Sequence, residues 1–369
     1  MGMADSIHVS RWLSQFDGTK VEFELISSSP HRNLSPGIAE RLASPSSLSM
    51  PWVSRYCSLV MWWVDRFLSD WVRGAYISWR IRVSRPDIVH VHELQNAGYA
   101  TRRAYQLLGR VRPKLLLTNY GSDIFWFSRI PKHQKKLREL LDLADGYSAE
   151  CERDYKLANK IASGFQLLPL MPTAGGLTRT NFEEGVRNKI AVKGYENLWG
   201  KALFVLQVLE EISEEIGDLE VVFYGCSNSV ISQAESVSRS SGLKIFAYGN
   251  GELSHSQVLE LFRQSVMYIG HSLSDGISTS MLEAMSMGAI PIQTCTSCAD
   301  EWIENNKTGF IVDPLDSVAI KQAILAIIHN EFDSDLARLE NYKVIESRYD
   351  SKDLAKVALS YYESLTYKI

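Results

Sequence analysis

Short apolar runs alternate with longer amphipathic segments between residues 189 and 330. The runs are brief and rich in β-branched and aromatic residues, which is typical of strands; they cover 189–193, 219–224, 243–248, 266–270, 289–293 and 309–312. Segments between them have helical spacing, as Val258, Leu259, Leu261 and Phe262 show. Continuous apolar strands separated by helices predict a parallel sheet covered on both faces, and hence a doubly wound α/β domain.

The N-terminal half follows the same logic. Its first apolar stripe has spacing i, i+3, i+4, i+7 and consists of Val9, Trp12, Leu13 and Phe16. An alternating strand is expected at 21–26, and later strands at 87–92, 114–118, 146–149 and 165–169. Two prolines and a glycine pair interrupt any periodicity over 169–176, so we predict a linker there. The sequence thus predicts two domains, 1–172 and 173–345, followed by a C-terminal segment 346–369.

The first strand of the N-terminal domain is apparently missing. A helix that begins near Ser6 should follow a strand, yet only Met1–Asp5 precedes it. In the usual strand order the first strand is central, so its absence would leave a gap in the sheet. Our hypothesis is that the native chain starts upstream of Met1 or that this chain has been shortened.

Composition narrows the functional class. The 369 residues include 45% hydrophobic and 22% charged residues, as in ordinary globular proteins. The 39 Lys and Arg are balanced by 43 Asp and Glu, net −4, which argues against a chain built to bind nucleic acid. An odd count of 5 cysteines fits a reducing compartment, and no apolar stretch reaches membrane-spanning length. We therefore expect a cytoplasmic protein.

Candidate chemistry is concentrated between Gly270 and Gly288. A strand enters a small polar loop, and a helix opens directly out of it, so backbone N–H groups and the positive end of the helix dipole point at one place. That arrangement is an anion site. Asp275 lies in the loop and Glu283 in the following helix, so both carboxylates can face the same crevice. A phosphate over the amides with hydroxyls near the carboxylates would suit a nucleotide sugar.

A purely structural explanation of Glu283 stays open at this point. Ser280-x-x-Glu283 has the spacing of a capping box, in which the glutamate returns to the start of its own helix and Gly288 closes the other end.

The same region resembles the retaining glycosyltransferases of family 4. Their pattern is a carboxylate, seven residues, then Glu-Ala-Met-x-x-Gly-x-Pro, and Asp275 with Glu283-Ala-Met-Ser-Met-Gly-Ala-Ile-Pro291 reproduces it. Downstream, 301–314 resembles the family's acidic residue, glycine turn and final strand. The resemblance covers roughly residues 85–365. It implies the GT-B fold, two Rossmann-like doubly wound domains facing each other across a cleft, with the C-terminal helix crossing back to the first domain.

The resemblance also implies roles for individual residues. Glu283 would hold the donor ribose, and the amides of Gly276, Ile277, Ser278 and Thr279 would hold phosphate and sugar. Asp275 would lie against sugar hydroxyls and is our candidate catalytic residue. Lys193 and Lys201 are candidates for the diphosphate, although the interval between them is longer than in the family. The donor would be a nucleotide diphosphate sugar, with UDP- and GDP-sugars as first choices, and we expect no further cofactor.

Candidates for the acceptor side come from the first domain. Leu115-Leu-Leu-Thr-Asn-Tyr-Gly-Ser-Asp123 resembles a family strand that ends in His-Gly-x-Asp, with Tyr120 in the place of the histidine. Gly121 and Asp123 keep the remaining pattern, and Asp123 could alternatively cap a helix. His8 lies where the family has its opening loop and helix. These four residues are possible acceptor or cleft residues.

Retention at the anomeric carbon needs a covalent intermediate or a front-face attack. No well-matched nucleophile is visible, so we favour front-face attack, with amides and lysines stabilising the departing diphosphate. The leaving phosphate can then accept the acceptor's proton. The acceptor is expected to be a carbohydrate or lipid-linked molecule of polysaccharide, lipopolysaccharide or glycoconjugate biosynthesis. An epimerase on the same fold and an inactive nucleotide-sugar-binding protein are the alternatives.

Two sequence motifs resemble metal-binding sites, but their positions in the predicted elements argue against metal binding. Asp333-Ser-Asp335 resembles a metal-binding Asp-x-Asp but lies in a late charged segment away from any strand end. His90 and His92 share one face of a strand, but Glu93 points away and no third ligand is evident. We expect no metal site.

Residues 52–85 carry a different signal. They contain five of the nine tryptophans, 52, 62, 63, 71 and 79, together with arginines 55, 66, 73, 80, 82 and 85. One long amphipathic helix of this kind could lie on an anionic membrane surface. The favoured alternative is a helix that buries its tryptophans against the first domain, with its arginines in water.

Overall fold

The computed structural model describes residues 1–31, 33–44, 48–51, 55–178 and 185–366. The chain divides into two compact units. Unit 1 comprises Met1–Gly176 and Ser351–Ile369, and unit 2 comprises Leu177–Asp350. Each unit is built around a parallel sheet.

Unit 2 contains a six-stranded sheet in the order β12-β11-β10-β7-β8-β9. Every pair is parallel, and the strands are β7 (Lys189–Lys193), β8 (Glu220–Cys226), β9 (Ile245–Gly249), β10 (Ser265–Gly270), β11 (Ile290–Thr294) and β12 (Phe310–Val312). All six predicted strands are confirmed to within two residues at each end. From β7 the chain adds β8 and β9 on one side, and it then returns to add β10, β11 and β12 on the other side. The topological switch point therefore lies between β7 and β10, and doubly wound sheets bind ligands in the crevice at the carboxyl ends of such a pair.

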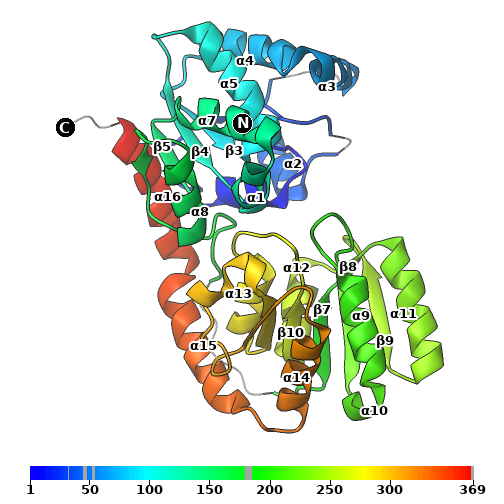
Figure 1. Ribbon diagram of the computed structural model, residues 1–369. Coiled ribbons are helices and arrows are strands. Elements are labelled where there is room, and N and C mark those ends of the chain that lie inside the picture. The colour runs from blue at the N-terminus through cyan, green and yellow to red at the C-terminus, as the bar shows by residue number, and fades with distance from the viewer. Residues whose placement is uncertain (32, 45–47, 52–54, 179–184, 367–369) are drawn as a thin grey trace. The chain divides into compact units, whose positions relative to one another are not determined.

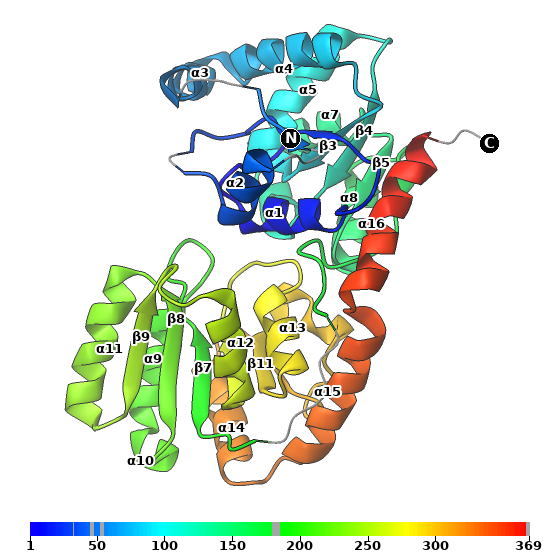
Figure 2. The same cartoon turned by 180° about the vertical axis from the view of Figure 1, so that it is seen from behind.

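Helices cover both faces of this sheet, as predicted. On one face lie α9 (Ala202–Glu211), α11 (Asn228–Ser241) and α14 (Ser317–Ile328), which share a buried core with the strands and appear in front of them in Figure 1. The other face carries α12 (His255–Arg263) and α13 (Thr279–Ser286), seen in front in Figure 2. Phe262 of α12 makes edge contacts with Tyr224 and Tyr268 of the sheet. The short α10 (Ser213–Ile216) and the long α15 (Ser334–Arg348) complete the unit.

Unit 1 contains a four-stranded parallel sheet in the order β3-β4-β5-β6 and a separate parallel pair. The four strands are β3 (Ile88–His92), β4 (Lys114–Thr118), β5 (Gly146–Ser148) and β6 (Gln166–Leu167), and the pair is β1 (Phe23–Glu24) with β2 (Leu48–Ser49). The strand expected over 21–26 is therefore only two residues long. Met1 and Gly2 lie between β3 and Ile26–Ser28 and hydrogen-bond to both.

Helices surround the strands of unit 1. Besides α3 and α4, which are described below, they are α1 (Ile7–Ser14), α2 (Pro36–Ala43), α5 (Tyr99–Leu108), α6 (Ser122–Phe125), α7 (Pro131–Leu141), α8 (Glu152–Ile161) and α16 (Ser351–Thr366), with a π-helical turn at Leu94–Gly98. A buried core unites β3, β4 and β5 with the helices α5, α7 and α8. The helix predicted near the C-terminus is present as α16 and belongs to unit 1.

The single long helix expected over 52–85 is wrong. Two helices occupy the segment, α3 (Arg55–Leu68) and α4 (Trp71–Ser84), and Trp52 lies outside the described residues. The helix is interrupted at Ser69 and Asp70, which have positive φ angles of 49° and 71°. Asp65 stabilises the break because its carboxylate accepts the Val72 N–H at 2.8 Å and the Arg73 N–H at 3.0 Å. Within the described residues, no helix has the length and apolar character needed to cross a membrane.

Candidate functional site

The switch point of unit 2 places a loop and a helix start at the end of β10. The chain leaves β10 at Gly270, runs through His271–Ile277 and enters α13. A Cβ on Gly270 would lie 2.1 Å from the Gln293 side-chain oxygen and 2.6 Å from the Tyr268 hydroxyl, so a larger residue at this turn would force both side chains to shift. The loop predicted from the sequence is therefore present, and close packing fixes its origin.

Ser278, rather than Ser280, caps α13. The Ser278 hydroxyl accepts the Met281 N–H, and the helix begins at Thr279. Ser280 and Glu283 consequently lie inside the helix, and the capping-box explanation of Glu283 is wrong. Gly288 does follow the end of the helix with φ of +82°, as expected for a residue that terminates it.

The buried Glu283 has a partner from another helix. Its Oε1 lies 2.8 Å from Nε2 of His255, the first residue of α12. Glu283 is 4% exposed, whereas the His255 side chain is 44% exposed. Sequence reasoning missed His255, because 28 residues separate the two and only the packing of α12 against α13 joins them. A carboxylate whose position is fixed in this way can accept hydrogen bonds from the hydroxyl groups of a ligand.

Lys193 brings positive charge to the same place. It ends β7, partly exposed, with Nζ 4.9 Å from the centre of the Tyr195 ring. Desolvation lowers the pKa of Lys193, but Asp275 and Glu283, together with nearby tyrosines, more than offset it, so the pKa is raised. The structure thus brings together Lys193, Asp275 and Glu283, and Lys193 has no ion pair within the described part of the chain.

Lys201 is directed elsewhere. Its Nζ donates to the Asn197 carbonyl at 2.7 Å and lies 3.9 Å from a Glu196 carboxylate oxygen, within its own loop. The loop nevertheless approaches β10, because the Lys201 N–H donates to the His271 carbonyl at 3.3 Å. Its backbone, rather than its ammonium group, contacts the candidate site.

The four predicted phosphate-binding amides are not equivalent. The Gly276 N–H donates to Oδ1 of Asp275 at 2.9 Å, so this group already has an acceptor. For Ser278 and Thr279, the described residues supply no acceptor to the backbone N–H, and both groups lie at the start of α13. Unpaired N–H groups at a helix start are a ready site for an anion. Ile277 is buried beside them.

In unit 1, the predicted residues His8 and Tyr120 lie together. Their ring centres are 5.4 Å apart, and the Tyr120 hydroxyl lies 2.8 Å from Nδ1 of His92. Burial raises the pKa of Tyr120, aided by the acidic residues around it, so its phenol stays protonated. His92 is the residue that the sequence pattern placed beside His90; their rings are 4.0 Å apart, as strand alternation predicted.

Asp123 holds two loops in place. Its carboxylate accepts the Tyr120 N–H at 2.9 Å and the Leu94 N–H at 3.0 Å, which joins the ends of β4 and β3. The residue is 3% exposed, and the α6 start at Gly121 has no side-chain cap, so the helix-cap explanation is wrong. Gly121 has φ of +90°, a conformation that favours glycine at this turn.

The Asp333-Ser-Asp335 motif has a structural explanation. Asp333 caps α15 by accepting the Leu336 N–H at 3.0 Å, and Asp335 pairs with Arg338 on the surface.

Comparisons with known proteins agree with this geometry. The sequence profile of the family described as glycosyl transferases group 1 matches residues 201–344. No curated protein matches the chain by sequence. Among solved structures, a glycosyltransferase from Rickettsia africae ESF-5 has a TM-score of 0.69 at 16% identity and covers 100% of this chain and 98% of its own.

Two further solved structures contain nucleotides. Anabaena Alr3699/HepE, in complex with UDP, has a TM-score of 0.68 at 11% identity and covers 99% of this chain and 98% of its own. The pneumococcal O-GlcNAc transferase GtfA, in complex with UDP and GlcNAc, has a TM-score of 0.64 at 14% identity and covers 80% of this chain. The chain spans 61% of the length of GtfA. These likenesses show the fold, which is that of the GT-B glycosyltransferases, and they favour neither of the two alternative functions.

Proposed function

We propose that this protein is a retaining glycosyltransferase that moves a sugar from a nucleotide diphosphate sugar to an acceptor hydroxyl. The observation that carries the proposal is the grouping of Lys193, Asp275 and Glu283 with the unpaired amides of α13 at the switch point of unit 2. A phosphate needs fixed N–H donors and a cation, and sugar hydroxyls need carboxylate acceptors. The matched family and the UDP found in two structures of similar fold support the same substrate class.

Each group has a proposed task. The Ser278 and Thr279 amides and the α13 dipole bind the diphosphate together with the Lys193 ammonium group. Glu283 accepts hydrogen bonds from the ribose hydroxyls while His255 holds its second oxygen. Asp275 faces hydroxyls of the transferred sugar. A UDP-sugar is the first choice of donor and a GDP-sugar the second.

The proposed reaction relies on the positive charge of Lys193 and the α13 amides beside the leaving diphosphate. The bond from the anomeric carbon to the diphosphate oxygen breaks, and charge that accumulates on the leaving oxygens is stabilised by the amides and Lys193. The acceptor oxygen bonds to the anomeric carbon on the same face, and its proton passes to an oxygen of the leaving diphosphate. Because Lys193 supplies the cation, this scheme needs no resident metal.

Nucleotide binding tests the donor site directly. Isothermal titration with UDP and GDP should give a specific dissociation constant for one of them, and Glu283→Gln should weaken it. Glu304→Gln changes an exposed carboxylate of the same unit, which pairs with the exposed Lys307, and serves as the control. Equal affinity in all three proteins would contradict the assignment. Anomeric configuration of the product, read by NMR, tests retention.

The acceptor is proposed to contact unit 1 near His8 and Tyr120. Their neighbouring rings offer an apolar surface with polar edges, which is suited to a sugar ring. We assign the acceptor to the carbohydrate or lipid-linked intermediates of polysaccharide, lipopolysaccharide or glycoconjugate biosynthesis.

An apolar ridge on α3 supports the proposal that the protein binds peripherally to the cytoplasmic face of a membrane. Tyr56, Val60, Trp63 and Phe67 recur at helical spacing and are 80%, 60%, 61% and 73% exposed. The expectation that the tryptophans are buried is wrong for Trp63, and also for Trp71 and Trp79 of α4, which are 42% and 54% exposed. Contiguous exposed aromatic side chains of this kind favour the interface of a bilayer.

The expectation that the arginines of 52–85 face an anionic membrane surface is only partly supported. Arg73 forms ion pairs with Asp65 and Asp70, and Arg80 pairs with Glu24, so neither is available to lipid headgroups. The apolar ridge must therefore carry most of the binding.

Vesicle flotation tests this part of the proposal. Changing Trp63 and Phe67 together to serine should lower partition onto anionic vesicles by about a hundredfold or more, since each buried aromatic side chain contributes about 1.5–3 kcal/mol. The same change at Leu336 and Leu339, exposed on α15, is the control. Unchanged partition of the double variant, or no partition of the unaltered protein at low salt, would contradict it.

A further inference from the structure

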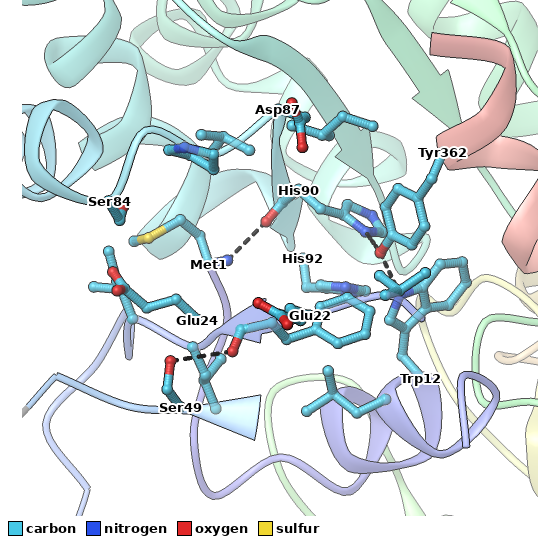
Figure 3. A pocket seen from close by; sticks show the side chains of 18 of the residues that line it. Met1, Trp12, Glu22, Glu24, Ser49, Ser84, Asp87, His90, His92 and Tyr362 are labelled. Atoms are coloured by element: carbon cyan, nitrogen blue, oxygen red, sulfur yellow. Dashed lines mark hydrogen bonds between the residues drawn. The ribbon is translucent and has the colours of Figure 1, made fainter. Parts of the chain in front are cut away.

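Tyr195 lies in the loop between β7 and α9, two residues after the end of the strand. Its hydroxyl has no hydrogen-bond partner among the residues that the structure describes. Tyr362 of unit 1 differs, because its hydroxyl accepts from Nε1 of Trp12 at 3.0 Å and lies 2.9 Å from Nδ1 of His90 (Figure 3). Tyr362 thus uses its hydroxyl, whereas the contacts of the Tyr195 side chain are made by its ring.

The Tyr195 ring is held against the end of β8. A Cβ on Gly225 would lie 2.7 Å from Cε1 and 3.3 Å from Cδ1 of this ring, so the ring packs directly on the backbone of the strand. The chain on both sides of Tyr195 is also fixed. The Gly194 N–H donates to the Tyr224 carbonyl at 2.8 Å, and the Ala202 N–H donates to the Tyr195 carbonyl at 3.1 Å. The ring therefore has a defined position at the protein surface.

The same loop contacts the loop that leads into α13. The Leu273 N–H donates to the Trp199 carbonyl at 2.9 Å, and Gly200 forms an antiparallel bridge with Ser272. These contacts fix Tyr195 relative to the candidate phosphate-binding loop as well as to β8.

The Lys193 ammonium group lies over this ring. Its Nζ is 4.9 Å from the ring centre. That distance is within the range of about 6 Å over which a cation is attracted to an aromatic face. A lysine ammonium group is a point charge on a flexible stem, so it takes many positions unless something holds it.

Two carboxylates compete for the same ammonium group. Asp275 and Glu283 both attract Lys193, and an ion pair with either would occupy the charge that a diphosphate needs. In the part of the chain that the structure describes, Lys193 forms no such pair. We infer that Tyr195 is a positioning residue, whose ring holds the Lys193 ammonium group for contact with the donor diphosphate. This inference rests on the proposed function, in which Lys193 binds the diphosphate.

An aromatic ring is well suited to this task. The ammonium group has three N–H donors, and a ring attracts its charge without supplying an oxygen that would occupy them. Diphosphate oxygens can then accept from Lys193 without first breaking an ion pair. Because the side chain is already ordered, less conformational freedom is lost when the ligand binds.

Binding of inorganic pyrophosphate, measured by titration calorimetry, tests the role of the ring. Tyr195→Leu should weaken binding by about threefold to thirtyfold, the range expected for loss of a cation–π contact. Tyr195→Phe keeps the ring and should stay within about twofold of the unaltered protein. Tyr195→Gln is a second variant without a ring, and thermal unfolding checks that each variant is folded. Phe246→Leu is the matched control, because Phe246 is 44% exposed on β9 and Tyr195 is 43% exposed.

A double-mutant cycle separates positioning from a merely structural role. In a protein that already carries Lys193→Met, the change Tyr195→Leu should cost less than about twofold in pyrophosphate affinity, because the ring acts only through the ammonium group. A ring that only supports the loop would instead weaken binding by the same factor with and without Lys193.

The outcomes distinguish this inference from the proposed function. If Lys193→Met weakens pyrophosphate binding but neither Tyr195→Leu nor Tyr195→Gln does, the inference is overturned and the contact of Lys193 with the diphosphate stands. Equal losses from Tyr195→Leu in both backgrounds, or a loss with Tyr195→Phe as large as with Tyr195→Leu, would overturn it as well. If Lys193→Met itself binds pyrophosphate as tightly as the unaltered protein, the proposed contact and the inference fail together.

Discussion

Removal of the Lys193 ammonium group should weaken nucleotide binding without unfolding the protein. Lys193→Met keeps the length and most of the apolar stem of the side chain while it deletes the charge. The residue ends β7 and has no ion pair among the described residues, so its charge is available to a ligand.

The expected magnitude follows from the contact that is lost. A charge-assisted hydrogen bond contributes about 1.5–3 kcal/mol, which corresponds to roughly 10- to 150-fold in the dissociation constant. The raised pKa of Lys193 shows that Asp275 and Glu283 stabilise its charged form. A folded pKa above the ordinary 10.5 gives stabilisation that is complete below that value and is lost only as pH rises through the folded pKa. Between about pH 6 and about pH 9 the effect on binding should therefore be constant.

Titration calorimetry with the preferred nucleoside diphosphate measures the effect. Lys307→Met, which removes an exposed lysine of the same unit, should leave affinity within twofold or so. If Lys193→Met binds the nucleotide as tightly as this control, the proposed contact with the diphosphate does not exist.

Three further predictions concern the rest of the chain. Glu283→Gln should weaken nucleoside diphosphates about tenfold or more by calorimetry, but leave affinity for inorganic pyrophosphate, which has no ribose, unchanged; equal loss for both ligands would refute the ribose assignment. Asp123→Ala should lower the free energy of unfolding by about 2–5 kcal/mol, measured with urea, because the buried Leu94 N–H and the partly buried Tyr120 N–H both lose their acceptor; a change below about 0.5 kcal/mol would contradict this. In a chain that begins at Met1, the buried amine, with its pKa lowered from 8.0 to about 5, should reduce stability as pH falls from 8 toward 5, by up to about 4 kcal/mol. N-terminal acetylation should abolish that pH dependence, and a pH profile identical with and without acetylation would refute it.

Much of unit 2 could be predicted from the sequence. Its inner strands β7, β8, β10 and β11 are largely buried on both faces, so each one is an apolar run that stands out between amphipathic helices. The motif of Asp275 and Glu283 could be placed because a loop between a strand and a helix is local in sequence.

The misses share a physical cause, which is contact between distant segments. The pairing of Glu283 with His255 depends on how α13 packs against α12, and nothing local encodes it. The break between α3 and α4 depends on the Asp65 carboxylate, which reaches across a turn to two N–H groups. The short β1 reflects its partner, because β1 and β2 pair over only two residues each and the alternating pattern of 21–26 does not encode where that pairing ends. The proposed division of donor and acceptor between the two units stays a prediction.

A structure of the protein with bound UDP or GDP tests the central claim most directly. The account predicts phosphate oxygens within hydrogen-bonding distance of the Ser278 and Thr279 nitrogens, and ribose hydroxyls on the Glu283 carboxylate. A nucleotide bound anywhere other than the carboxyl ends of β7 and β10 would contradict it.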